Sequence, residues 1–113
     1  MGSNGWWQRF TGRFRRGTGG GQPPLEKDVV AQNQSQLEAF VASRRGVEVF
    51  VEAPTNLNRP SVLLIAHDGE SVRRSVPSVR WGHDFAKRRD LPSYDAGVVG
   101  YPQRMRDYNR RRR

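Results

Sequence analysis

The sequence predicts a small α/β domain of the α+β type, with a mostly antiparallel sheet of about four strands, helices on one face and a basic segment at each end. Three observations support this prediction. The apolar run Val62–Ala66 is followed closely by Asp68-Gly69, and Asp-Gly between extended segments is the strongest short-range hairpin signal. Alternating valines precede this hairpin, and segments with helical spacing lie on both sides of it. The expected order of elements is α-β-β-β-α-β-α.

The length of 113 residues suits one domain, and a hydrophobic content of 35% indicates a small core with unfolded ends. We assign residues 1–22 to a flexible basic and aromatic N-terminal tail, residues 23–109 to the compact domain and residues 110–113 to an arginine tail. No apolar run is long enough to span a bilayer, and the apolar core of a signal peptide is missing, so a cytoplasmic protein is expected.

The first helix is expected from about residue 25 to residue 45, where Gly46 can end it. Its apolar residues recur at helical spacing: Leu25, Val29, Leu37, Phe40 and Val41. Ser35–Glu38 also matches a capping box, so the helix could instead begin near Ser35. The next segment, Val47–Glu52, alternates in polarity and predicts a strand whose three valines share one buried face.

The hairpin is expected to close through a two-residue type I′ turn at Asp68-Gly69. That turn fixes the register, so it pairs His67 with Glu70, Ile65 with Val72, Leu63 with Arg74, and Ser61 with Val76. Leu63, Ile65, Val72 and Val76 would then share one face, with Arg73 beside Leu64 on the other. A slip of one residue would reverse both faces, which makes this a sharp prediction.

The segment after the hairpin predicts a helix, a strand and a second helix. Ser78 is the expected N-cap of the first helix, and the residues facing the sheet are Val79, Gly82, Phe85 and Ala86. Ser93–Gly100 predicts a strand that runs parallel to a neighbour, because a helical crossover precedes it. Pro102 then opens a short helix over Gln103–Asn109, with Tyr101, Met105 and Tyr108 on its inner side.

The net charge of +9 comes from the two ends of the chain. Residues 1–22 carry four arginines and no acid, residues 104–113 carry six arginines against Asp107, and residues 23–103 hold ten basic and ten acidic side chains. A partner attracted by charge should therefore meet the ends first. All basic residues except Lys27 and Lys87 are arginines, which suit bidentate phosphate contacts, although a GC-rich genome would produce the same bias.

The N-terminal leader combines arginines with aromatic residues. If the leader is helical, Trp7, Phe10 and Phe14 share one face, with Trp6 beside them. This pattern fits an amphipathic segment on an anionic membrane surface, and it fits equally a segment that stacks on nucleic-acid bases while its arginines hold phosphates. Gly5 and Gly12 weaken the helical interpretation, and a disordered leader with no binding role is the third alternative.

Catalytic and metal chemistry is not expected. With no cysteine, the chain has no thiol nucleophile and no Cys-ligated metal. Each histidine precedes an aspartate, in His67-Asp68 and His83-Asp84, but adjacent residues point apart on a strand or a helix, and Asp68 is a turn former. We therefore expect no catalytic residue, no metal ligand and no cofactor.

The arginine pairs of the central region, Arg44-Arg45, Arg73-Arg74 and Arg88-Arg89, are expected to be solvated charges balanced by nearby acids. The alternative is an anion-binding face that these pairs form together with the tails. Asp95 is expected to pair with an arginine rather than to act as a catalytic acid.

Two motifs carry a resemblance to other proteins: Ala66-His67-Asp68-Gly69-Glu70 and the closing run Val98–Tyr108. Through them, residues 46–108 resemble a group of small actinobacterial proteins of unknown function, some of which carry the label "oxidoreductase". The resemblance implies a shared fold and no particular activity. A redox role finds no support in the residues, because the chain has neither a Cys pair nor a GxGxxG following a strand.

The sequence thus predicts a non-enzymatic basic binding protein whose partner is nucleic acid, RNA more than DNA. The expected binding residues are Trp6, Trp7, Arg9, Phe10, Arg13, Phe14, Arg15, Arg16, Arg110, Arg111, Arg112 and Arg113. Two alternatives stand beside this prediction: an adaptor held on an anionic membrane by the leader, and a protein-interaction module that uses the neutral core. The chain contains no complete motif of a known nucleic-acid-binding family, so the prediction rests on the placement of charge.

Overall fold

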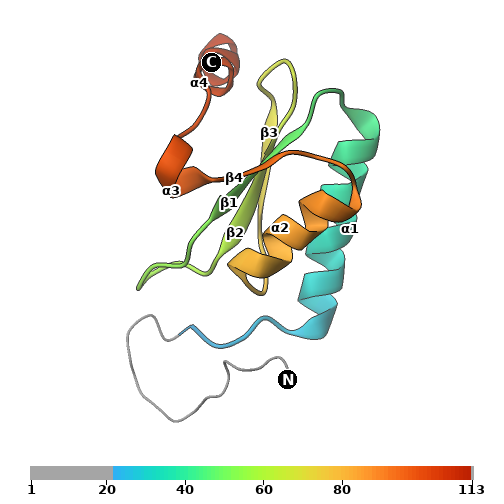
Figure 1. Cartoon of the computed structure of the whole chain (residues 1–113), viewed down its shortest axis with the longest axis vertical. Helices are drawn as coiled ribbons and strands as arrows, with labels where there is room; N and C mark the ends of the chain where they lie inside the picture. Colours follow the sequence, from blue (N-terminus) through green and yellow to red (C-terminus); the bar gives the residue numbers. More distant parts are fainter. Residues whose placement is uncertain (1–21, 113) are drawn as a thin grey trace.

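A computed structural model of the chain describes residues 22–112 and shows four strands and four helices (Figure 1). In chain order the elements are α1 (Lys27–Ser43), β1 (Glu48–Glu52), β2 (Ser61–Ile65), β3 (Ser71–Ser75), α2 (Val79–Arg88), β4 (Ser93–Asp95), α3 (Ala96–Val99) and α4 (Gln103–Arg111). The predicted α+β fold and its order of elements are confirmed, with the four-residue helix α3 as an addition.

The four strands form one sheet in the order β3-β2-β1-β4. Strands β1, β2 and β3 are antiparallel neighbours, and β4 lies parallel to β1, with Val49 opposite Ser93. The parallel pairing follows from the crossover through α2, as the sequence predicts. The strand itself is shorter than predicted, because the Asp95 carboxylate accepts a hydrogen bond of 2.9 Å from the backbone of Gly97 and caps α3. The predicted strand over Ser93–Gly100 is therefore wrong beyond Asp95, which caps a helix and forms no ion pair with an arginine of residues 22–112.

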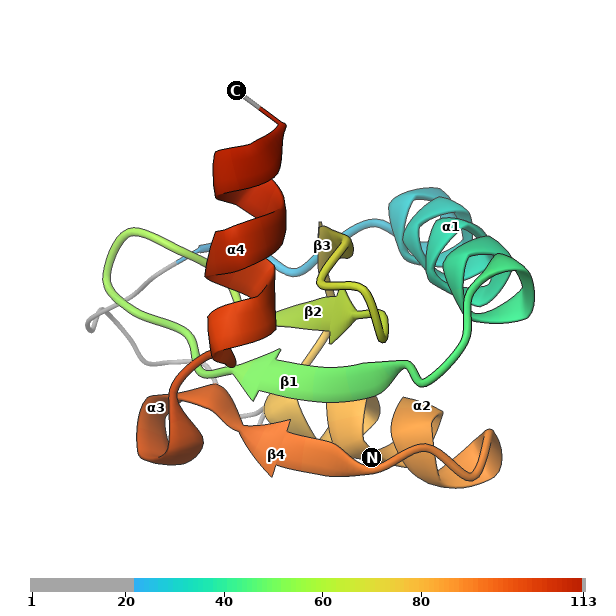
Figure 2. The ribbon, with the colours of Figure 1, turned by 90° about the horizontal axis from the view of Figure 1, so that it is seen from above.

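Helices α1 and α2 cover one face of the sheet. The core there contains the predicted valine face of β1, together with Leu37 and Phe40 of α1 and Phe85 of α2. The prediction that all helices lie on one face holds only for α1 and α2. Phe50, Leu63 and Ile65 point to the opposite face, where Tyr101 and the α4 residue Met105 cover them. Figure 2 shows α2 beneath β1 and β4, with α4 rising on their other side. An apolar second face requires cover of its own, which α4 provides.

The hairpin register is shifted by one residue from the prediction. Leu63 lies opposite Arg73, and Leu64 lies opposite Val72. The backbone of Ala66 bonds to Glu70 and to Gly69, which closes a three-residue loop in which only Gly69 has a positive φ, of 98°. A type I′ turn needs a positive φ at Asp68 as well, so the loop takes the longer form with glycine in the last position. As a result Val72 and Val76 pack with Leu64, not with Leu63 and Ile65.

Helix α1 is continuous from Lys27, so the capping box at Ser35 does not start it. Helix α2 begins as predicted, with the Ser78 hydroxyl accepting a hydrogen bond of 3.0 Å from the backbone of Trp81. Gly82 lets α2 approach the sheet closely, because a Cβ at this position would lie 2.9 Å from a Val62 methyl and 3.1 Å from Val51.

Replacing Gly82 by alanine is expected to lower the free energy of unfolding by about 1–3 kcal/mol, because the added methyl overpacks the contact between α2 and the sheet. Urea denaturation measures this change. Gly97→Ala is the control: Gly97 is exposed, and the nearest atom to an added Cβ belongs to Asp95 at 3.3 Å. Equal stabilities of the two variants would contradict the close approach of α2.

Candidate nucleic-acid interface

Helix α4 and its C-cap carry three of the eight arginines that the sequence predicts as binding residues. It begins after Pro102, runs to Arg111 and has Arg112 as its C-cap, so Arg110 and Arg111 belong to the helix and not to a tail. Four arginines are exposed on it: Arg106, Arg110, Arg111 and Arg112. We call these four residues the arginine set of α4.

The inner side of α4 is fixed to the sheet by contacts at the hairpin. Arg104 donates to the backbone carbonyl of Ala66 at 3.1 Å and to the Glu48 carboxylate at 2.5 Å. Gly69 lies directly beneath the helix, where a Cβ would overlap the carbonyl of Arg104. These contacts leave the arginine set on the outside of a helix that the sheet holds in place.

The arginine set is arranged as two groups around α4. Arg106 and Arg110 are four residues apart and therefore share the outer face of the helix. Arg111 and Arg112 lie over the Tyr108 ring, with 5.9 Å and 5.6 Å between each guanidinium carbon and the ring centre. Guanidinium groups beside an aromatic ring are a combination that nucleic-acid-binding surfaces use, because phosphate and base contacts become available together.

The charges of the arginine set are only partly balanced within residues 22–112. Arg110 forms an ion pair of 2.6 Å with Asp107, and hydrogen bonds from Gln103 and then from Arg110 lower the pKa of that carboxyl. Arg106 bonds to the Gln103 amide oxygen at 2.8 Å. Neither Arg111 nor Arg112 has a carboxylate partner in the described part of the chain. An anion would therefore meet a net positive helix.

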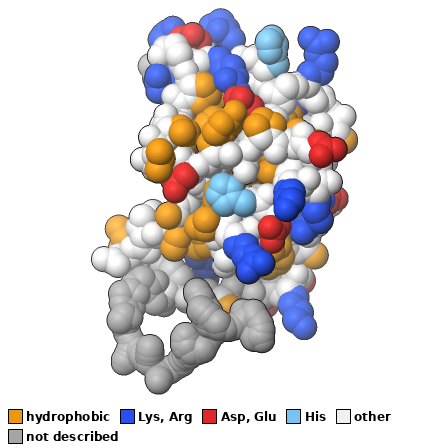
Figure 3. All heavy atoms as spheres, in the orientation of Figure 1, with side chains coloured by type: hydrophobic (Ala, Val, Ile, Leu, Met, Phe, Trp, Pro, Cys, Tyr) orange, Lys and Arg blue, Asp and Glu red, His pale blue; other side chains and the backbone are white. Residues whose placement is uncertain are grey.

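A second basic group lies beside α4, where the chain turns at Arg45 after the end of α1. His67 at the hairpin tip donates its backbone N–H to the carbonyl of Arg45 at 2.9 Å, so the turn after α1 and the hairpin tip are held together. A small hollow of about 210 Å³ lies between them and is lined in part by Arg45 and His67. The Arg111 guanidinium reaches the Asp68 carbonyl at 3.4 Å. Figure 3 shows basic side chains gathered over this end of the molecule.

The central arginine pairs are each balanced through one member, in line with the sequence interpretation. Arg44 forms an ion pair with Glu70, Arg73 with Glu52, and Arg89 with Glu38. The hydrogen bond that Arg44 donates to the Glu70 carboxylate is the main reason why the pKa of Arg44 is raised.

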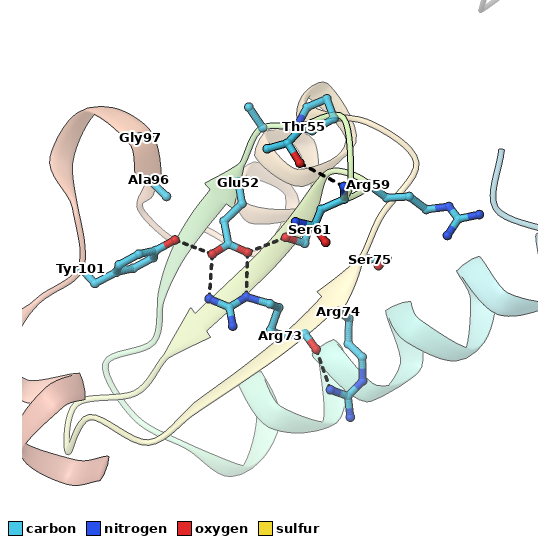
Figure 4. Close-up of a pocket in the computed structure, with 13 residues that line it drawn as sticks. Glu52, Thr55, Arg59, Ser61, Arg73, Arg74, Ser75, Ala96, Gly97 and Tyr101 are labelled. Atoms are coloured by element: carbon cyan, nitrogen blue, oxygen red, sulfur yellow. Dashed lines mark hydrogen bonds and ion pairs between the residues drawn. The ribbon is translucent and has the colours of Figure 1, made fainter. Parts of the chain in front are cut away.

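Glu52 is the centre of a polar network at the other end of the same sheet face. Its carboxylate accepts two hydrogen bonds of 2.8 Å from Arg73 and one of 2.5 Å each from Ser61 and Tyr101 (Figure 4). Burial acts to raise the pKa of Glu52, but these hydrogen bonds, led by the one from Arg73, outweigh burial and lower the pKa to about 2. The same network borders a hollow of about 810 Å³.

The sequence-predicted binding residues fall into two groups. The structure places Arg110, Arg111 and Arg112 together on α4. The remaining ones lie outside the described residues: Trp6, Trp7, Arg9, Phe10, Arg13, Phe14, Arg15, Arg16 and Arg113. Sequence reasoning did not include Arg106 among the binding residues, and it named Arg45 only within the alternative anion-binding face. The four-residue spacing of Arg106 and Arg110 on a predicted helix was the available signal for Arg106, whereas nothing in the sequence brings Arg45 to the hairpin.

The two His-Asp pairs do not converge. His67 and Asp68 are exposed at the hairpin tip, whereas His83 lies on α2 and its Nδ1 is 2.8 Å from the Ser93 hydroxyl oxygen. Figure 3 shows the two histidines well apart. Within residues 22–112, no three His, Asp or Glu side chains form a group that could hold a metal ion.

No protein-family model, curated protein or solved structure matches this chain. None of the helices between residues 22 and 112 is long and apolar enough to cross a membrane. The residues that remain as functional candidates are the arginine set of α4 and its basic neighbours.

Proposed function

We propose that this protein binds single-stranded nucleic acid, RNA in preference to DNA, through the arginine set of α4 together with the arginines of the leader. The observation that supports this function best is the exposure of four arginines on one anchored helix, next to Tyr108. Arginine guanidinium groups bind phosphates in bidentate geometry and release counterions from the strand, which favours binding and makes it salt-dependent.

Anchoring of α4 contributes to affinity in this proposal. Because Arg104, Met105 and Gly69 fix the helix on the sheet, its arginines do not need to be ordered at the moment of binding. Tyr108 offers a partly exposed ring for a base, and Arg111 and Arg112 beside it can hold the adjoining phosphates. The leader would add further arginines and aromatic residues to the same strand.

The variant R110Q/R111Q/R112Q in the full chain tests this function. Loss of three phosphate contacts is expected to weaken binding of a labelled single-stranded RNA at least tenfold at low salt. The slope of log affinity against log salt concentration should become shallower by about 2, since each contact with a single strand contributes roughly 0.7. Fluorescence anisotropy at several salt concentrations measures both quantities.

The matched control is K27Q/K87Q/R88Q, which removes the same charge from exposed residues of α1 and α2 that have no carboxylate partner within residues 22–112. Its affinity is expected to stay within about threefold of the parent protein, because only the long-range field changes. Equal losses in both triple variants would assign binding to overall charge and would overturn the role of α4.

The two other functions suggested by the sequence remain predictions with tests of their own. Binding to anionic liposomes that requires Trp6 and Trp7, without RNA binding, would favour the membrane adaptor. For the protein-interaction module, the exposed side chains of Val98 and Val99 on α3 are the first positions to substitute, because they are 79% and 54% exposed.

A further inference from the structure

Asp68 at the hairpin tip is an exposed acid at the edge of a basic surface. It forms no ion pair within residues 22–112. Two other acids in this region do have cationic partners: Asp107 pairs with Arg110, and Glu70 pairs with Arg44. A carboxylate without a cation beside it repels the phosphates of a strand, so it lowers affinity unless the strand supplies a hydrogen-bond donor to it.

The turn of the hairpin uses only part of the Asp68 carboxylate. Its Oδ1 atom accepts a hydrogen bond of 3.0 Å from the backbone N–H of Glu70, which is the local bond that makes aspartate a turn former. In the described part of the chain, no group donates to its Oδ2 atom. An ionised carboxylate has about four acceptor positions on its two oxygens. The hairpin therefore holds this side chain in place and leaves acceptor positions open to a ligand.

Asp68 adjoins both parts of the proposed binding site on α4. Tyr108 packs against Gly69, the next residue along the hairpin, where an added Cβ would lie 2.9 Å from the Cβ of Tyr108. Nη2 of Arg111 lies 3.4 Å from the backbone carbonyl oxygen of Asp68. On its other side, Asp68 lines the hollow of about 210 Å³ together with Arg45. Figure 1 shows the tip of the hairpin between β2 and β3 beside α4.

The part of a nucleotide that would meet Asp68 is its sugar. A nucleotide whose base stacks on Tyr108 and whose phosphate is held by Arg111 has its ribose between the two, because the ribose joins base and phosphate. Within a strand, the 2′-OH is the hydrogen-bond donor of the ribose, and DNA lacks this group. A hydrogen bond from a hydroxyl to a carboxylate is charge-assisted and therefore roughly twice as strong as a neutral one.

We propose that the Asp68 carboxylate accepts a hydrogen bond from a ribose 2′-OH and thereby selects RNA over DNA. This inference rests on the proposed function and names the residue behind its preference for RNA. With DNA, the same carboxylate has no donor and still lies near the phosphates, so it repels the strand. Asp68 thus favours RNA both by attracting the 2′-OH and by disfavouring a strand that lacks it.

The first test changes the strand and uses the parent protein as the full chain. Anisotropy at low salt compares a labelled oligouridine of roughly twelve nucleotides with its 2′-deoxy and 2′-fluoro analogues, which carry the same base. The 2′-fluoro sugar keeps an RNA-like conformation but cannot donate a hydrogen bond. The RNA strand is expected to bind about tenfold more tightly than either analogue. If the 2′-fluoro strand binds like RNA, the shape of the sugar sets the preference and the inference is overturned.

The second test compares Asp68→Asn with Asp28→Asn in the full chain. Both variants remove one negative charge from an exposed aspartate, and both keep an oxygen for a local backbone N–H, which is 3.0 Å away in each case, at Glu70 and at Val29. Asp28 lies in the first turn of α1, at the opposite end of the molecule from α4 (Figure 1). In Asp68→Asn the uncharged NH₂ group replaces the free acceptor, so the three strands should bind within about twofold of one another. Asp28→Asn should keep the about tenfold preference of the parent.

The remaining outcomes separate this inference from the proposed function. If Asp68→Asn binds RNA and keeps the preference of the parent, the role of Asp68 is overturned while RNA binding through α4 stands. An equal loss of affinity for all three strands would assign the carboxylate to a base edge or to the shape of the turn, and it would overturn the contact with the 2′-OH. Absence of RNA binding by the parent protein overturns both proposals.

Discussion

Glu52→Gln is expected to lower the free energy of unfolding by about 3 kcal/mol at pH 7. In the native protein the carboxylate is 16% exposed and accepts hydrogen bonds from Arg73, Ser61 and Tyr101. An amide keeps only one acceptor oxygen and turns its NH₂ group toward a donor, so at least one of these groups loses its partner. Urea denaturation at pH 7 measures the change.

The difference in the free energy of unfolding between the parent protein and Glu52→Gln should depend on pH. The pKa of Glu52 falls from 4.5 in the unfolded chain to about 2 in the folded protein, which corresponds to roughly 3 kcal/mol at about 1.4 kcal/mol per pH unit. A lowered pKa stabilises the fold above pH 4.5, and this contribution is lost as the pH falls toward 2. The stabilities of parent and variant should therefore converge in this range. A constant difference from pH 7 to pH 2 would contradict the network, and Glu26→Gln, at an exposed site, should have little effect at any pH.

Gly69→Ala is expected to release α4 from the sheet and to destabilise the protein by about 3 kcal/mol. Alanine at a φ of 98° is strained by roughly 1–2 kcal/mol, and its Cβ would overlap the carbonyl of Arg104, so the helix has to move. The additional loss comes from the contacts of Arg104 and Met105 with the sheet. Hydrogen exchange of the α4 amides measures the release directly.

Gly100→Ala separates backbone strain from the clash. Gly100 also has a positive φ, of 72°, but no atom lies within 4 Å of an added Cβ. This control should lose only the roughly 1–2 kcal/mol of strain and should keep the α4 amides protected. If Gly69→Ala behaves like Gly100→Ala, the tight contact between the hairpin and α4 does not hold the helix.

The elements with strong local signals could be predicted from the sequence. The three valines of β1, the N-cap Ser78 and the parallel crossover to β4 follow from alternation, capping chemistry and chain connectivity. The hairpin register could not be decided in this way. Asp68-Gly69 is compatible with two-residue and three-residue loops, and the choice depends on packing Val72 and Val76 against Leu64 and on placing Gly69 beneath α4.

The candidate site was only partly predictable for a similar reason. A cluster of arginines at the end of the chain is visible in composition, and so Arg110, Arg111 and Arg112 could be named. The network around Glu52 could not be predicted from the sequence. Ser61, Arg73 and Tyr101 come from three distant segments, which meet only through the sheet register and the entry into α4. Charge composition therefore points to the two ends of the chain, whereas the network around Glu52 exists only in the tertiary structure.

The central claim, that this basic protein binds single-stranded nucleic acid, is tested most directly by a salt titration of the full chain with a labelled single-stranded RNA. Anisotropy should show tight binding at low salt that weakens steeply as salt rises, with a slope of log affinity against log salt of about −3 or steeper, as expected for four or more phosphate contacts. No binding at low salt, or binding that salt does not change, would contradict the account.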